Sequence, residues 1–379
     1  MSSRFIQIHS LTSYPAVLLN RDDAGLAKRL PYGGTSRIRV SSQCLKRHWR
    51  IADDEWALAK IGAPMAVRSR HVVEREIMPA LSGVEESLFE AITVALVKKL
   101  FGDKNLEVKK RQAMLLGRPE IDYLTKLALQ AAQTGEIKAA EALIDETLGK
   151  GAGKRNLAAM REIAGNLAAG LESALFGRMV TSDPEANTDA AIHVAHAFTV
   201  HAEESESDYF TVVDDLMKSD EGEAGTAGIF ETELTSGLFY SYVVIDVPAL
   251  ISNLGGDVKL AAKVVEHFLH LMATISPGAK KGSTAPYSYA DLMLVETGMR
   301  QPRSLAGAFR KAVNLQAGDL LAGAAVQLAK HLQQLDAAYG QGEQRQALSL
   351  EHVQLPGVSD YISLDALASW AAASLGEGA

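Results

Sequence analysis

The chain has 379 residues, a formal net charge of -8 and a single cysteine, Cys44. One cysteine excludes an intrachain disulfide, and no uncharged apolar run is long enough to cross a bilayer. We therefore expect a cytoplasmic protein with a large hydrophobic core, divided into two or three subdomains, and no membrane contact.

The charge is unevenly distributed along the chain. Residues 1–80 contain 13 Lys and Arg against 7 Asp and Glu, a balance of +6, so the remaining residues carry 25 against 39, a balance of -14. Such segregation indicates a local basic surface on an acidic protein, although surface charges also segregate by chance.

The first 60 residues predict two strands, a loop and a helix. Residues 5–9 and 36–40 alternate apolar and polar residues, as strands do, and residues 10–32 resemble a loop. If Ile38 and Val40 face the core, Arg37 and Arg39 face outward together. A serine at position 41 or 42 then suits the N-terminus of a helix.

That helix has an apolar face and a basic face. Leu45, Trp49 and Ala52 share one side by their spacing. The polar residues beside or opposite them are Gln43, Lys46, Arg47 and Arg50.

Residues 61–188 predict an inserted all-helical domain. A helical repeat runs through Leu157, Leu167, Leu171 and Leu175, and Pro119 suits the first turn of another helix. The glycine-rich residues 149–153 predict a flexible joint between helices.

Strand patterns return after residue 188. Residues 192–200 and 237–247 predict strands, residues 257–275 a helix, residues 291–296 a strand and residues 364–375 a helix. An acidic, glycine-containing segment, residues 205–228, predicts a protruding loop around an apolar island. The expected fold is α+β, an antiparallel sheet with helices and two excursions, for which a ferredoxin-like or RNA-recognition core fits the order of elements.

Three motifs suggest chemistry but are better explained otherwise. Residues 149–154 lack the first glycine of a phosphate-binding loop, and Arg155 replaces its Ser or Thr. His193 and His201 lie on one face of a strand and His196 on the other, so they do not converge on a metal. The pairs at 22–23 and 214–215 could bind magnesium, but adjacent acidic residues are commonly solvated loop residues.

The basic strand and helix at residues 37–50 remain open to two interpretations. Cations on rigid elements, with Ser42 and Gln43 as neutral hydrogen-bonding partners, suit a nucleic-acid backbone. A solvated amphipathic helix explains the same spacing equally well.

The sequence resembles the CasC backbone subunit of the type I-E CRISPR Cascade complex. The resemblance rests on ordered motifs that span most of the chain: NRDD at 20–23, GGTSRIRVSSQCLKRHWR at 33–50, GRMVTS at 177–182, DYF at 208–210, SGLFYSYV at 236–243, PGAK at 277–280 and ADLMLV at 290–295. Residues 61–175 show the poorest correspondence.

The resemblance implies a hand-shaped, non-catalytic subunit without cofactors. Its palm would comprise residues 1–60, 189–204 and 229–379, its helical finger residues 61–188 and its thumb loop residues 205–228. Copies would form a helical filament with other Cascade subunits along one CRISPR RNA, whose bases pair with a target DNA strand. The residues expected to contact RNA are Arg21, Arg37, Arg39, Ser42, Gln43, Lys46, Arg47, Arg50, Met179, Tyr209, Phe210, Thr211, Val213 and Lys280.

Two other functions remain as alternatives. Related subunits of other CRISPR complexes cut RNA with a loop aspartate, so Asp22 and Asp23 could serve a metal-dependent ribonuclease. A generic single-strand-binding protein would bind random RNA as tightly as a CRISPR guide.

Overall fold

The computed structural model describes residues 3–149, 157, 165, 167–180, 183–213, 226–316 and 318–376. These residues form two compact units. The first contains residues 3–57, 194–244 and 265–376, and the second contains residues 58–193 and 245–264. In the described part of the chain, no helix is both long and apolar enough to span a membrane.

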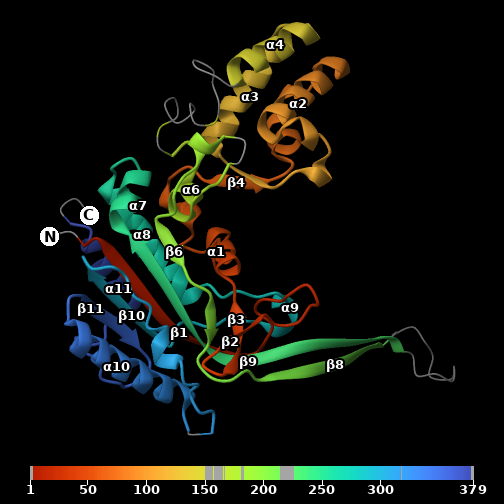
Figure 1. Cartoon of the computed structure of the whole chain (residues 1–379). Coiled ribbons are helices and arrows are strands. Elements are labelled where there is room, and N and C mark those ends of the chain that lie inside the picture. Colours follow the sequence, from red (N-terminus) through yellow and green to blue (C-terminus); the bar gives the residue numbers. More distant parts are fainter. Residues whose placement is uncertain are drawn as a thin grey trace. The chain divides into compact units, whose positions relative to one another are not determined.

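The first unit is built on an antiparallel sheet with several helices (Figure 1). Seven strands follow the order β11-β10-β1-β9-β7-β3-β2. Their bounds are β1 Phe5–Val17, β2 Arg29–Tyr32, β3 Thr35–Val40, β7 Ala197–Thr199, β9 Thr226–Asp246, β10 Leu292–Gly298 and β11 Gln344–Ser349. Its helices are α1 Ser42–Arg50, α9 Lys281–Thr284, α10 Leu320–Tyr339 and α11 Leu364–Ala373.

Two consecutive glycines, Gly33 and Gly34, precede the basic strand and helix and form the turn between β2 and β3. Tyr32 pairs with Thr35, which leaves Gly33 and Gly34 as a two-residue connection with φ values of 62° and 82°. Such a turn requires positive φ at both central residues, which glycine adopts without strain. At Gly33 a side chain is also excluded, because a Cβ atom would lie 1.6 Å from the Arg310 carbonyl oxygen.

In the described part of the segment predicted as a thumb loop, residues 205–213 and 226–228 belong to two paired strands, which form a β-hairpin. Strand β8, Ser205–Val213, pairs antiparallel with the first half of β9, from Ser205 opposite Thr235 to Val213 opposite Thr226. The hairpin extends beyond the other strands of the sheet (Figure 1). A loop is therefore the wrong description of residues 205–213, because residues 205–212 are exposed on both faces of the strand and no apolar face marks it in the sequence.

The second unit contains the helices of the predicted insertion. They include α2 Glu86–Phe101, α3 Arg118–Gln133, α4 Ile137–Leu148 and α6 Leu171–Phe176, and a later part of the chain adds α7 Val247–Asn253 to this unit. Apolar side chains such as Ile92, Leu96, Leu124 and Ile144 form its core. Three elements cross the boundary between the units along the chain: β6, Ile192–Val194, the end of β9, and α8, Val258–Thr274.

The prediction of an all-helical insertion is wrong in two respects. Strands β4, Ala66–Ser69, and β5, Met114–Gly117, form a two-stranded sheet, and four residues are too few to show alternation. The predicted repeat through residues 157–175 is not one helix, because Gly170 adopts φ 81° immediately before α6.

Candidate nucleic-acid interface

Helix α1 presents part of the basic segment on the surface. The Ser41 hydroxyl oxygen accepts a hydrogen bond from the Cys44 amide at 3.3 Å, so Ser41 rather than Ser42 caps the helix. Leu45 and Trp49 are buried as predicted, and the Trp49 ring meets the edge of Phe268 at 5.1 Å between centroids.

The predicted RNA-contacting residues of α1 differ in exposure. Gln43 and Arg47 are exposed, and Lys46 and Arg50 are half-buried. Ser42 is buried, so little of its surface remains available to a ligand. The burial of one face therefore leaves the two cations that follow Leu45 in sequence, Lys46 and Arg47, near the surface.

The prediction that Arg37 faces outward is wrong. Its side chain is fully buried, and its guanidinium donates hydrogen bonds to the carbonyl oxygens of Thr199 and Phe309, both at 3.0 Å, and of Tyr32 at 3.3 Å. The chain around Phe309 covers this face of β3, which sequence alternation within β3 does not reveal. Arg37 is therefore a structural residue in this chain.

Arg39 is only half-buried and lies beside a histidine. Its guanidinium contacts His196 Nδ1 at 3.0 Å and donates to the Arg29 carbonyl oxygen at 3.2 Å. Burial lowers the pKa of His196, and the positive charges of Arg39, Lys28 and Lys46 lower it further. The neutral imidazole can then accept a hydrogen bond from Arg39.

We call Lys28, Arg39, Lys46 and Arg47 the basic patch. The charges of Lys28 and Arg47 also act on the Cys44 thiol, whose pKa burial raises and these charges lower. Four cations around one helix and strand create a positive potential that suits a phosphodiester backbone. Sequence reasoning missed Lys28, because it lies in a segment read as a loop before the basic motif.

The loop before β2 holds Arg21 at the surface. Asn20 Oδ1 accepts a hydrogen bond from the Ser41 amide at 2.9 Å, which ties this loop to the start of α1. Asp22 Oδ1 accepts bonds from the amides of Ala24 and Leu26, both at 3.0 Å. Asp22 thus closes a turn, and the described residues contain no group of three or more His, Cys, Asp or Glu side chains suited to a metal.

The other magnesium and histidine candidates add no site. Residues 214–215 and most of the glycine-rich segment 149–154 lie outside the described residues. His201 is buried, and its Nε2 accepts a hydrogen bond from the Leu238 amide at 3.2 Å. His193 contacts the carbonyl oxygen of Ala190 at 3.0 Å.

The β8–β9 hairpin carries exposed aromatic rings. Tyr209 and Phe210 are exposed, and the Phe210 ring stacks on Phe230 with centroids 5.6 Å apart. Thr211 is also exposed, and Val213 is the last residue of β8. Exposed rings of this kind can stack on nucleic-acid bases.

The base of the hairpin is fixed to β2 by ion pairs. Arg29 donates to Glu203 at 2.9 Å and forms a second ion pair with Glu233. Glu233 also accepts a hydrogen bond from the Ala27 amide at 2.6 Å. These contacts fix the hairpin base to the strand that precedes the glycine turn.

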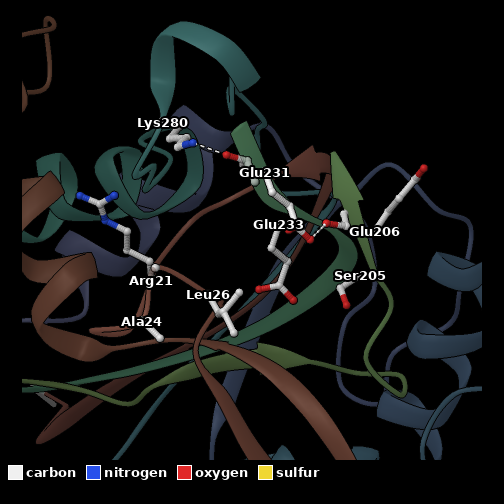
Figure 2. Close-up of a pocket in the computed structure, with 11 residues that line it drawn as sticks. Arg21, Ala24, Leu26, Ser205, Glu206, Glu231, Glu233 and Lys280 are labelled. Atoms are coloured by element: carbon white, nitrogen blue, oxygen red, sulfur yellow. Dashed lines mark hydrogen bonds between the residues drawn. The ribbon is translucent and has the colours of Figure 1, made fainter. Parts of the chain in front are cut away.

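A cavity of about 550 Å³ lies between the Arg21 loop, the hairpin base and Lys280. Figure 2 shows the cations Arg21 and Lys280 and, on the hairpin, Glu231 and Glu233; Glu206 also lines the cavity, but its carboxylate points away from it. The Lys280 ammonium donates a hydrogen bond to the Thr232 hydroxyl. The mixed charge of its walls makes the cavity a weaker anion site than the basic patch.

Met179 belongs to the second unit, where its side chain is 77% exposed. Single exposed apolar side chains are ordinary on protein surfaces, so this exposure leaves Met179 available for a contact without by itself indicating one. It is the one predicted contact residue outside the first unit.

Comparison with known proteins identifies relatives of the whole chain. The family model for the CT1975-like protein matches residues 6–371. A chain of a structure described as a CRISPR RNA-guided surveillance complex, pre-nicking, has a TM-score of 0.80 and 28% sequence identity, covering 97% of this chain and 100% of that one. A second chain, from a CRISPR RNA-guided surveillance complex, has a TM-score of 0.69 and 25% identity, covering 97% and 99%. No curated protein sequence matches the chain significantly.

Proposed function

Because the chain belongs to the CT1975-like protein family, we propose that it is a backbone subunit of a CRISPR RNA-guided surveillance complex and binds CRISPR RNA. The observation that carries this proposal is the similarity over 97% of the chain to a subunit of such a complex, at a TM-score of 0.80. The basic patch supports it, because an acidic protein with a concentrated cationic surface suits an anionic partner.

The proposed binding is sequence-independent. Lys46, Arg47 and Arg39 would pair with phosphates, whose positions do not depend on base identity. Such contacts leave the base edges free, and in RNA-guided complexes pairing with target DNA supplies the specificity. Tyr209 and Phe210 on the hairpin would contact bases by stacking, which tolerates any sequence.

We further propose that the complex is of type I-E and that several copies of this chain form a filament along one guide. The ordered motifs named above support the subtype. The sheet order β10-β1-β9-β7, with α1 after β1 and α8 before β10, supports a ferredoxin-like core. We propose no catalytic role, and the use of Asp22 in a turn favours this choice over a ribonuclease.

The test is RNA binding by the Lys46→Ala/Arg47→Ala double variant. We expect weaker binding to every guide sequence, and a salt dependence shallower by about 0.7 in log–log slope for each phosphate that the variant no longer neutralises. Affinity is measured at several salt concentrations with two unrelated guides. Lys330→Ala on α10 is the matched control, since Lys330 is an exposed lysine remote in sequence from the patch.

Three outcomes would contradict the proposal. A loss of affinity for only one guide sequence would indicate base readout. Equal affinity for random RNA and for a guide with CRISPR-repeat ends, within the assembled complex, would indicate a generic single-strand binder. Magnesium-dependent RNA cleavage that disappears in Asp22→Ala would indicate a ribonuclease.

A further inference from the structure

The loop that follows α8 carries two exposed tyrosines that the proposed function does not use. Tyr287 is 70% exposed and Tyr289 is 72% exposed. Aromatic rings bury 150–250 Å² when they pack, so two neighbouring rings left in water represent a substantial unpartnered surface.

This loop is firmly anchored although its tyrosines are exposed. The Ser276 hydroxyl donates to the Ser288 carbonyl oxygen at 3.0 Å and accepts from the Ser288 amide at 3.0 Å. Pro286 and Ala290 are buried, so buried or bonded residues alternate with the exposed tyrosines from 286 to 290. The rings are therefore presented by a rigid backbone, which limits the conformational entropy lost when they bind a ligand.

A cation lies against one face of Tyr287. The Lys281 ammonium is 5.8 Å from the centroid of that ring, within the range of a cation–π interaction. Lys281 is itself exposed, on the four-residue helix α9. A ring with a cation on one face keeps its other face for stacking on a base, and the cation is placed for the adjacent phosphate.

The same loop borders the surface proposed to bind RNA. The Ala279 amide donates to the Leu18 carbonyl oxygen at 2.9 Å, next to the loop that carries Arg21. Burial lowers the pKa of His48 on α1, and the charges of Lys281 and Arg47 lower it further, so both cations lie within electrostatic range of one imidazole. Lys280 reaches the hairpin through Thr232.

We propose that Tyr287 is a stacking residue for single-stranded RNA, with Lys281 binding the neighbouring phosphate, so that residues 280–289 form a further wall of the guide-binding surface. Charge complementarity supports RNA as the occupant, because Tyr287 adjoins the Lys281 ammonium and both Lys281 and Arg47 lie within electrostatic range of His48. This proposal rests on the proposed function, but it concerns residues that the basic patch does not include.

The test uses single-stranded RNA in which one base at a time is replaced by 2-aminopurine, whose fluorescence falls when it stacks on an aromatic ring. In the full-length protein we expect quenching at particular positions, retained in Tyr287→Phe and lost in Tyr287→Ala. We expect Tyr287→Ala to weaken binding roughly 5- to 150-fold, the range for one base–aromatic stack.

The salt dependence separates the two proposed roles. Tyr287→Ala removes no charge and should leave the log–log slope unchanged, whereas Lys281→Ala should make it shallower. Tyr339→Ala on α10 is the matched control, since Tyr339 is 75% exposed, and it should change neither affinity nor quenching.

The possible failures are distinguishable. If Lys46→Ala/Arg47→Ala weakens RNA binding while Tyr287→Ala leaves affinity and quenching unchanged, the stacking proposal is wrong and the proposed function stands. If neither variant affects RNA binding, the proposed function fails as well. If Tyr287→Ala abolishes association between copies but leaves RNA affinity unchanged, the loop is a protein interface and the proposal is overturned.

Discussion

Arg37 shows that neighbouring arginines in one motif can have different tasks. Arg37 is fully buried and donates to three carbonyl oxygens, whereas Arg39, two residues later, is half-buried beside His196. Burying a guanidinium is costly unless its donors find acceptors, and here they do. The distinction depends on the chain around Phe309, which covers only part of β3.

We predict that Arg37→Met lowers stability and leaves RNA binding by the folded protein unchanged. The substitution leaves buried carbonyl groups without a hydrogen-bond donor, and each unsatisfied group costs about 1–3 kcal/mol. The free energy of unfolding should therefore fall by roughly 2 kcal/mol or more. Urea denaturation and RNA titration measure the two effects. Arg47→Ala should behave oppositely; reduced RNA affinity with unchanged stability in Arg37→Met would contradict the assignment.

For single residues, the environment could be predicted from the sequence where burial follows from spacing within one helix. Leu45 and Trp49 are buried, and Ser41 caps α1, because these properties depend on one helix alone. Arg37 and Lys28 were misjudged or missed because their environments are formed by distant parts of the chain. Tyr287 was missed for the same reason, since its cation is identified only by three-dimensional proximity.

The hairpin is the element whose position depends most on a few contacts. Near the sheet, β8 is bonded to β9, and the ion pairs of Arg29 with Glu203 and Glu233 join the hairpin base to β2. Farther out, Tyr209 and Phe210 are exposed, and Phe210 stacks on Phe230 of the same hairpin. The orientation of these rings therefore depends on the base.

We predict that Arg29→Ala loosens the hairpin without unfolding the sheet. The two ion pairs are partly solvated, so we expect a local loss of about 1 kcal/mol and up to roughly tenfold faster amide exchange in residues 205–213. Hydrogen exchange with mass spectrometry measures this rate. Glu206→Gln, at an exposed position of β8, is the control. Equal protection in Arg29→Ala and the native protein would show that strand pairing alone holds the hairpin.

At the element scale, long periodic segments were predicted best. The strand at β10 and the helix α11 appear near their expected positions, because each has a clear apolar face. Strands β4 and β5 were missed because four residues carry too little periodicity. Strand β8 was read as a loop because both faces of a protruding hairpin meet solvent, so no apolar side marks it.

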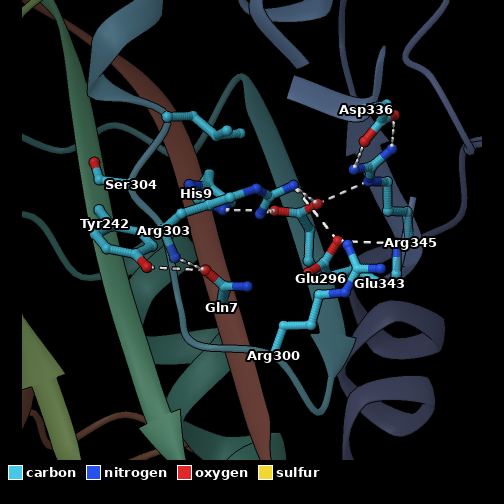
Figure 3. Close-up of polar contacts among 12 residues, drawn as sticks. Gln7, His9, Tyr242, Glu296, Arg300, Arg303, Ser304, Asp336, Glu343 and Arg345 are labelled. Carbon is cyan, nitrogen blue, oxygen red and sulfur yellow. Dashed lines mark hydrogen bonds and ion pairs between the residues drawn. The ribbon is translucent and has the colours of Figure 1, made fainter. Parts of the chain in front are cut away.

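For the first unit as a whole, one buried polar network connects most of the sheet. Figure 3 shows Glu296 of β10 between Arg303 and Arg345, with His9 of β1 beside it. Its carboxylate accepts from Arg303 at 2.7 and 3.0 Å and from Arg345 at 2.7 Å. Arg345 of β11 in turn pairs with Asp336 of α10 at 2.6 and 2.7 Å.

His9 connects this network to β9. Its Nε2 lies 3.2 Å from Glu296 and its Nδ1 lies 2.9 Å from the Tyr240 hydroxyl. Burial lowers the pKa of His9, which favours the neutral ring. Because a carboxylate only accepts hydrogen bonds, Nε2 carries the proton and Nδ1 accepts from Tyr240. Four strands and a helix are thus joined through side chains.

We predict that Glu296→Gln destabilises the protein by about 3–5 kcal/mol, because it removes the buried charge that Arg303 and Arg345 share and leaves Arg345 with Asp336 as its carboxylate partner. Chemical denaturation at pH 7 measures the change. Asp360→Asn, at an exposed position, is the matched control and should have little effect. A loss below about 1 kcal/mol would mean that the remaining hydrogen bonds compensate for the charge.

The pH dependence of this loss follows from the protonation of Glu296. Burial alone would raise the pKa of its carboxyl group, but the hydrogen bonds from His9 and Arg303 and the positive charge of Arg303 hold it well below the usual 4.5. In the unfolded chain the carboxyl group binds its proton near pH 4.5, whereas in the folded protein it stays ionised to lower pH. The contribution of Glu296 to the free energy of unfolding is therefore complete above pH 4.5. It declines as the pH falls toward the pKa of the group in the folded protein. The stability difference between the native protein and Glu296→Gln should therefore be constant from pH 7 to about 5.5 and shrink below pH 4.5. A difference that stayed constant from pH 7 down to pH 3 would show that the pKa of Glu296 is the same in the folded and unfolded states, because only a group that titrates differently in the two states couples stability to pH.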